Sequence, residues 1–163
     1  MRSRTAAAGS ALFFVVAPGV VAGLIPWRLT AWEVLPGPWR VRGLGLLLLV
    51  VSVPVLVGAF VQFARDGLGT PAPVAPTERL VVRGAYRFVR NPMYLAVVGA
   101  IVGQALLLGQ LGLLPYAALV AVLMVVFVRF YEEPTLRRQF GAEYEAYRRA
   151  VPGWWPRLRS WKA

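Results

Sequence analysis

The sequence predicts an all-α integral membrane protein: a bundle of about four transmembrane helices followed by an amphipathic C-terminal helix on the cytoplasmic side. The 163-residue chain is 58% hydrophobic with a mean hydropathy of +0.61, which is too apolar for a soluble domain of this length. Its apolar residues gather in long runs, and its basic residues lie between those runs. A single membrane domain is expected over residues 1–163.

Four apolar runs approach the length of about 20 residues that a helix needs to cross the hydrocarbon core. The spans are expected at about residues 6–27, 41–63, 93–109 and 113–130. The last two share one apolar block, and residues 109–112, Gly-Gln-Leu-Gly, are the predicted turn between them. A signal peptide is the alternative for the first run, but its length and the three later runs favour a retained helix.

The charge pattern predicts the orientation. The net charge is +11, and 15 of the 18 basic residues lie on the cytoplasmic side if the N-terminus does, leaving Arg28, Arg40 and Arg42 outside. The positive-inside rule therefore predicts that both termini are cytoplasmic. Arginine-rich, lysine-poor usage hints at a GC-rich bacterium, hence a bacterial inner membrane. Membrane lipids are the expected partners, and nucleic acid is not, because no basic soluble domain is present. Nothing in the sequence predicts an oligomeric state.

The chain has no cysteine and no histidine. This composition excludes disulfides, thiol nucleophiles, a histidine base and metal sites built from these residues, so no metal is expected. Any acid or base must come from the seven carboxylates, the tyrosines, Lys162 or the substrate.

The residues after Phe130 predict an amphipathic helix. Its apolar stripe has helical spacing and consists of Leu136, Phe140, Tyr144, Tyr147 and Val151. Gly141 lies inside this helix and indicates a close approach or a break. The pattern fits two arrangements equally well: a helix at the headgroup level, anchored by the tryptophans that follow, or a helix folded over a cytoplasmic site.

Glu132 and Glu133 are adjacent carboxylates at the end of the fourth predicted span. Neighbouring helix residues point about 100° apart, so the two cannot share one role. If one faces the bundle, the other can face water or pair with Arg137. Pro134 would clash with the carbonyl of Phe130 in a straight helix, so a bend is expected here. The pair is either a solvated group at a helix start or a functional one, as carboxylates near bilayer depth often are.

Asn91-Pro92 predicts the start of the third span, because asparagine is a favoured N-cap and proline suits the next position. Such a helix start presents free N–H groups and a positive dipole end, which bind carboxylates or phosphates. Arg90 adds charge, and Tyr86 and Tyr94 add amphipathic rings. The stretch is therefore either an interfacial anchor or half of a ligand site.

Two motifs flank the predicted hairpin of the third and fourth spans. The first, RLVVRGAYRFVRNPMYLA, has the pattern Gly-x-Tyr-x-x-x-Arg-Asn-Pro-x-Tyr, and the second is EEPTLRRQFGAEYEAYRRAVPGWWP. Together they resemble the isoprenylcysteine carboxyl methyltransferase family, whose signature the phospholipid N-methyltransferases share. The resemblance covers about Thr77 to Pro156. Each motif alone is weak, but their order around a pair of spans is specific.

The resemblance implies an integral membrane methyltransferase that uses S-adenosylmethionine, held by segments 77–94 and 129–156. Asn91 stands where the family has histidine; it keeps a donor and an acceptor but cannot carry charge. A family arginine linked to the substrate corresponds most closely to Arg129. Carried over residue by residue, the cofactor contacts are Arg79, Leu80, Val81, Tyr86, Asn91, Pro92, Met93, Tyr94 and Glu132.

Methyl transfer from a sulfonium requires alignment, water exclusion and favourable electrostatics. A carboxylate is already a nucleophile, so a prenylcysteine-like or other lipid-like carboxylate is the expected acceptor. A phospholipid amine or a small thiol is the alternative, and an amine would need a base such as Glu133 or a tyrosine. A lipophilic acceptor is expected to enter sideways from the bilayer and the cofactor from the cytoplasm. A sterol-reductase-like enzyme with a nicotinamide cofactor and a non-enzymatic membrane protein are the other hypotheses.

Overall fold

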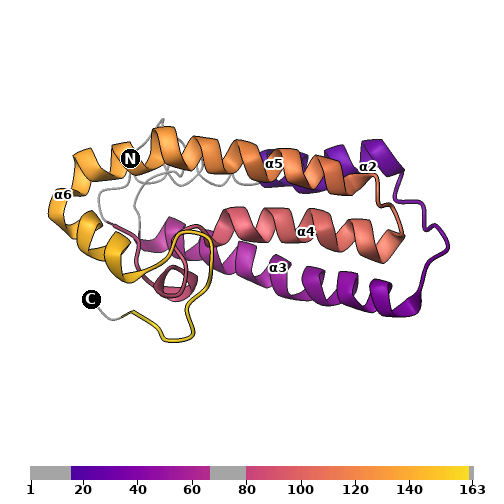
Figure 1. Ribbon diagram of the computed structural model, residues 1–163, viewed down its shortest axis with the longest axis horizontal. Coiled ribbons are helices and arrows are strands. Elements are labelled where there is room, and N and C mark those ends of the chain that lie inside the picture. The colour runs from indigo at the N-terminus through magenta and orange to yellow at the C-terminus, as the bar shows by residue number, and fades with distance from the viewer. Residues whose placement is uncertain (1–15, 67–79, 162–163) are drawn as a thin grey trace.

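Figure 1 shows a bundle whose long helices lie side by side along one axis. The computed structural model describes residues 16–66 and 80–161, and every regular element within them is helical, which confirms the predicted fold class. The first helix, Val16–Thr30, contains a π-helical turn and ends as α2. The elements are η1 (Val20–Leu24), α2 (Ile25–Thr30), α3 (Trp39–Asp66), η2 (Gly84–Arg87), α4 (Pro92–Leu108), α5 (Leu113–Phe127), η3 (Val128–Glu132) and α6 (Glu133–Ala150).

The outer surface of the bundle is apolar. Two helices are long and apolar enough to cross a membrane, Trp39–Gln62 and Leu113–Ala150, whereas the first helix and α4 are apolar but shorter. Only 17% and 22% of the most apolar stretches of the two long helices are buried, so side chains such as Leu47, Val50 and Val122 face outward. Such a surface is unfavourable in water and suits lipid, which indicates a membrane protein.

The connection between α4 and α5 depends on one glycine. Gly109 ends α4 in the left-handed conformation with φ of 71°, and its N–H donates to the carbonyl of Leu106. A Cβ at this position would lie 3.0 Å from the carbonyl oxygen of Leu35, whose own N–H donates to the carbonyl of Leu108. The backbone angle and the lack of space both favour glycine here.

α3 and α4 pack through small residues. Gly99 and Gly103 lie one helical turn apart on α4, and Gly45 of α3 faces Gly103. A Cβ at Gly45 would lie 2.7 Å from the carbonyl oxygen of Gly103 and would overlap the backbone of Leu107. In membranes, small residues at this spacing let helix backbones approach closely, and van der Waals contact then stabilises the pair. α3 and α4 are therefore closely packed against each other.

Polar groups inside the bundle hold the first helix against α4 and α5. Pro26 has no N–H, so this turn of the helix, which carries the carbonyls of Val21 and Ala22, lacks one backbone donor that any other residue would supply. The Tyr116 hydroxyl donates to the carbonyl of Val21 at 2.7 Å, and Gln104 Nε2 donates to that of Ala22 at 2.7 Å. An unpaired carbonyl is costly in hydrocarbon, so these side chains satisfy the freed groups and also position the helix.

Where the sequence predicts a bend before Pro134, the helix contains a π-helical turn and continues. η3 joins α5 to α6 continuously, and the N–H of Glu133 donates to the carbonyl of Val128, five residues earlier. This wider π spacing accommodates a proline that cannot complete the ordinary ladder. The sharp change of direction comes at Gly141, where φ is 50° and ψ is −121° (Figure 1). Because glycine adopts this conformation far more readily than other residues, Gly141 marks a break rather than a close approach.

The apolar stripe of α6 is buried inside the protein. Tyr144, Tyr147 and Val151 are at most 3% exposed. The Tyr147 hydroxyl donates to the carbonyl of Tyr86 at 2.7 Å. The partly buried side chains that pack against the stripe include Leu80, Val82, Leu136, Phe140 and Trp161. The stripe of α6 therefore packs against this end of the bundle, as in the second arrangement that the sequence leaves open.

Gly45→Ala is expected to destabilise the protein by about 1–3 kcal/mol, because the added methyl group overlaps the α4 backbone. The midpoint of thermal unfolding in detergent micelles measures this loss. Gly43→Ala is the matched control, since Gly43 lies in the same helix with nothing within 4 Å of an added Cβ. Alanine there should be neutral or slightly stabilising. Equal midpoints for the two variants would contradict the close packing of α3 and α4.

Candidate functional site

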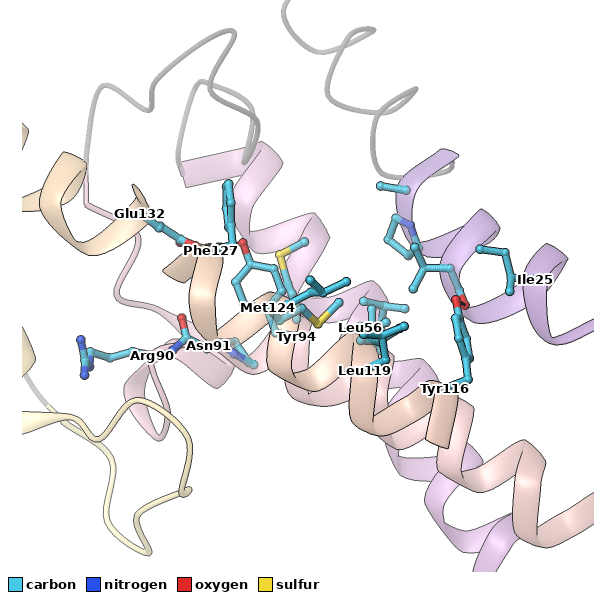
Figure 2. A pocket seen from close by; sticks show the side chains of 18 of the residues that line it. Ile25, Leu56, Arg90, Asn91, Tyr94, Tyr116, Leu119, Met124, Phe127 and Glu132 are labelled. Atoms are coloured by element: carbon cyan, nitrogen blue, oxygen red, sulfur yellow. Dashed lines mark hydrogen bonds between the residues drawn. The ribbon is translucent and has the colours of Figure 1, made fainter. Parts of the chain in front are cut away.

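A cavity of about 460 Å³ lies between the first helix, α3, α4 and α5 (Figure 2). Its volume is in the range of ligand pockets. One end is polar, and the remaining wall consists mainly of apolar side chains from the first helix and one face of α5. The polar end is lined by Tyr86, Arg90, Asn91, Tyr94 and Glu132. The cavity is therefore shaped for a molecule, or a pair of molecules, with a polar and an apolar part.

Tyr94 and Glu132 link α4 to the end of η3. The Tyr94 hydroxyl donates to Glu132 Oε2 at 2.8 Å. Tyr94 lies in the first turn of α4, and Glu132 is the last residue of the π-helical turn, a feature that is frequent at functional sites. The hydrogen bond holds the carboxylate at the polar end of the cavity.

Asn91 occupies the N-cap position of α4, as the sequence predicts. Its side chain, however, makes no capping hydrogen bond to the helix. Instead, its Nδ2 donates to the carbonyl of Gly153 at 3.0 Å. Asn91 is 5% exposed and lines the cavity, and its Oδ1 accepts no hydrogen bond from the described residues. The first-turn N–H groups of Met93 and Tyr94 thus remain without a side-chain cap beside the cavity.

Tyr86 of η2 completes the polar end. It is 8% exposed and packs with Ala59, Val81 and Met93. Burial, reinforced by the negative charge of Glu132, raises the pKa of the Tyr86 phenol above its usual value. The hydroxyl therefore keeps its proton and stays a neutral donor at the cavity wall.

Arg90 points away from the apolar side chains and joins the segments behind the site (Figure 2). Its Nη1 donates to Glu133 Oε1 at 2.7 Å and to the Tyr144 hydroxyl at 3.0 Å. Its Nε donates to the carbonyl of Val151 at 3.0 Å. The Arg90 and Glu133 side chains are only 13% and 9% exposed. This charge-assisted pair ties the start of α4 to the start of α6.

The segment after α6 closes over η2 and the start of α4. Three backbone N–H groups form the contact: Arg90 to Pro152 at 2.9 Å, Arg157 to Phe88 at 2.9 Å and Trp161 to Arg87 at 3.0 Å. The ring centroids of Trp154 and Tyr94 are 6.5 Å apart. The C-terminal segment is therefore part of the wall behind the polar end.

The predicted cofactor contacts divide into three groups. Leu80 packs against the α6 stripe and Val81 beside Tyr86, so neither lines the cavity. Arg79 lies outside the described residues. Those that do line the cavity are Tyr86, Asn91, Pro92, Met93, Tyr94 and Glu132.

The predicted catalytic residues lie elsewhere. Glu133 does not line the cavity, and its carboxylate is engaged by Arg90. The Arg129 side chain is 61% exposed, with its Nη1 3.5 Å from Glu133 Oε2, and it also lies outside the cavity wall. The structure therefore separates these two residues from the cluster around Tyr94.

Sequence reasoning missed the apolar wall. The positions that α5 contributes repeat every three or four residues and form one helix face. Because α5 is apolar all round, its pattern gives no contrast between a cavity face and a lipid face. Tyr116 was an available signal, since a hydroxyl inside an apolar span needs a partner. The missed residues are Ala17, Pro18, Val21, Ile25, Leu56, Val97, Tyr116, Leu119, Val120, Leu123, Met124 and Phe127.

The cavity also opens sideways. Leu119 and Leu123 line it and yet are 56% and 58% exposed on the apolar outer surface. An apolar bundle with a cleft that leads from this surface to a buried polar cluster defines an integral membrane protein with a pocket that has a polar end and an apolar part.

The chain belongs to the phospholipid methyltransferase family, which matches residues 41–143 and is part of the group of integral membrane methyltransferases that the sequence motifs resemble. It is 28% identical over 148 residues to a phosphatidylethanolamine N-methyltransferase of Phaeosphaeria nodorum. That match covers 79% of this chain and 15% of the relative, so the chain spans a small part of the relative's length. No solved structure matches the chain. The predicted membership of this group is confirmed.

Glu133→Gln is expected to loosen the docking of α6, because it removes the charge that balances the buried Arg90. A loss of about 3 kcal/mol in unfolding free energy and faster proteolysis of the C-terminal segment should follow. Thermal unfolding and limited trypsin digestion measure the two effects.

Glu145→Gln is the matched control on the same helix. Its carboxylate pairs with Arg137 at 2.8 Å, but both side chains are more than 30% exposed. Losing such a surface pair should change stability by less than about 1 kcal/mol. Equal losses in the two variants would show that the buried pair does not hold α6 in place.

Proposed function

We propose that the protein transfers a methyl group from S-adenosylmethionine to the amine of a membrane phospholipid. The observation that carries the proposal is a cavity with a polar end, where Tyr94 and Glu132 are hydrogen-bonded, and an apolar cleft that leads away from it. A water-soluble cofactor suits the first and a lipid tail suits the second. Family membership and similarity to a protein named phosphatidylethanolamine N-methyltransferase support the same assignment.

The polar end offers groups that match S-adenosylmethionine. When bound, the cofactor supplies a methyl group on a positively charged sulfur. Glu132 and the ring of Tyr94 are suited to cationic groups. The uncapped start of α4, at Met93 and Tyr94, is suited to a carboxylate. The Asn91 Oδ1 and the Tyr86 hydroxyl line the cavity and are suited to the polar edge of an adenine ring.

The charge at this end favours an amine over a carboxylate acceptor. Glu132 is the carboxylate that lines the described cavity, and Arg90, the cation in the same wall, is already paired with Glu133. An anionic acceptor would meet an unfavourable charge at Glu132, whereas a phospholipid ammonium would be attracted to it. The carboxylate acceptor expected from the sequence is therefore the weaker of the two hypotheses, and the comparisons support the amine better.

An ammonium must lose a proton before its nitrogen attacks a methyl group. Glu132 is our candidate for the group that orients the ammonium and accepts this proton. Tyr94 acts as a positioning residue, since its hydrogen bond fixes one oxygen of the carboxylate at the polar end. The apolar side chains around them limit access of water, which strengthens these interactions.

Glu133 and Arg129 receive different roles from those that the sequence suggests. Glu133 is engaged by Arg90 outside the cavity, so we propose that it positions α6 rather than acting as a base. Arg129 lies on the outside of η3 beside Glu133, where it is suited to lipid phosphates at the membrane edge. We propose that the α6 end is cytoplasmic, because the basic residues gather there.

Purified protein in nanodiscs that contain phosphatidylethanolamine is expected to move label from methyl-labelled S-adenosylmethionine to the lipid headgroup, as followed by lipid mass spectrometry. A farnesylated cysteine derivative and a small alkyl thiol serve as the competing acceptors. Labelling confined to the farnesylated carboxylate or to the thiol would overturn the amine assignment. If no acceptor is labelled and calorimetry detects no binding of the cofactor, the protein is not this methyltransferase.

Glu132→Gln is expected to lower the methylation rate by roughly a hundredfold or more, the usual contribution of a proton acceptor. Tyr94→Phe keeps the ring and loses the hydrogen bond, so a decrease of roughly tenfold is expected. Glu143→Gln and Tyr131→Phe are the matched controls, because both residues are exposed and outside the cavity wall. Full activity of a folded Glu132→Gln variant would remove Glu132 from the reaction.

A further inference from the structure

The apolar part of the cavity has a definite end. Tyr116 lines the cavity and lies at the opposite end from Glu132 and Arg90 (Figure 2). Its side chain reaches from α5 to the first helix, where the hydroxyl donates to the carbonyl of Val21 at 2.7 Å. The ring therefore spans the cleft between two helices that otherwise form its opposite walls.

The bundle beyond Tyr116 is closely packed. Leu113, one turn earlier on α5, is 1% exposed, and Ile101 and Ala105 of α4 are completely buried. All three belong to one apolar cluster, against which Tyr116 and Val21 pack. A chain that extends along the cleft from the polar end thus meets the Tyr116 ring and then a filled core.

The position of the Tyr116 ring is fixed by the sequence of the first helix. Pro26 cannot donate to the carbonyl of Val21, so that carbonyl is free to accept the bond from Tyr116. In an apolar interior such a bond is strongly preferred over two unpaired groups. The hydrogen bond therefore keeps the ring across the cleft.

The length of the cleft suits one acyl chain. Phe127 and Tyr116 both line it and lie eleven residues apart on α5, which corresponds to about 16 Å along the helix. Half of a hydrocarbon core is about 15 Å thick, and this is the depth that one acyl chain of a single leaflet covers. The cleft thus matches a lipid whose headgroup lies beside Glu132.

We propose that Tyr116 limits the length of the acyl chain that the cavity accepts and so selects among phospholipids of the same headgroup. This inference rests on the proposed function, because it takes a phospholipid as the acceptor. Methylenes beyond the Tyr116 ring must leave the cleft through its open side and lose contact with the protein. Replacing the ring by a methyl group extends the cleft toward Leu113.

The test uses the full-length protein in detergent with an equimolar mixture of dilauroyl, dimyristoyl, dipalmitoyl and distearoyl phosphatidylethanolamine. Native mass spectrometry reports which lipids stay bound, and methylation of the same mixture is followed in parallel. Tyr116→Ala is expected to shift both preferences to longer chains, with the ratio of distearoyl to dimyristoyl lipid rising roughly threefold or more as new contacts form. Tyr116→Phe keeps the ring, so it should keep the wild-type preference while melting at a lower temperature.

Val122→Ala is the matched control, since Val122 is on the same helix, is 59% exposed and does not line the cavity. An unchanged preference in a folded Tyr116→Ala variant, or an equal shift in Val122→Ala, would overturn the inference. If Tyr116→Ala leaves the chain-length preference of methylation unchanged, the role of Tyr116 is rejected and the proposed function still stands. If the bound lipids show a chain-length preference that depends on Tyr116 but are never methylated, the proposed function is rejected and the role of Tyr116 still stands.

Discussion

The buried ion pair between Arg90 and Glu133 is the interaction on which the shape of the site depends. It joins the start of α4 to the start of α6, which are 43 residues apart in the chain. A buried pair is stable only when its remaining polar groups are satisfied, and the Tyr144 hydroxyl and the Val151 carbonyl contribute to this. Because adjacent helix residues point in different directions, fixing Glu133 behind the site turns Glu132 toward the cavity.

The features that follow from local sequence preferences were predictable. Asn91-Pro92 marks the start of α4, because the preferences for these residues at the first positions of a helix are local. The α6 stripe identifies its buried face, since aromatic residues at helical spacing alternate with charged ones. The cluster of Tyr86, Asn91, Tyr94 and Glu132 could be anticipated from two motifs that flank a hairpin, because a hairpin brings its two ends together.

The features that depend on partners far away in the chain were not predictable. A choice between Glu132 and Glu133 as the inward carboxylate required knowledge of where Arg90 lies. The Asn91 amide turns to Gly153 rather than capping its own helix, because the C-terminal segment brings a carbonyl within 3.0 Å. The apolar wall was hidden for another reason: a helix that is apolar all round carries no mark of which face is turned to lipid and which to a ligand.

The sideways opening at Leu119 and Leu123 has a consequence for how the two halves of the cavity are supplied. A ligand that enters between the helices diffuses in two dimensions, so its availability is set by its mole fraction in the leaflet and not by its amount per volume. Under the proposed function, the cofactor reaches the polar end from water, where ordinary concentration applies. Diluting the membrane with an inert lipid would then lower occupancy of the apolar part by the phospholipid, while the cofactor continued to saturate the polar end.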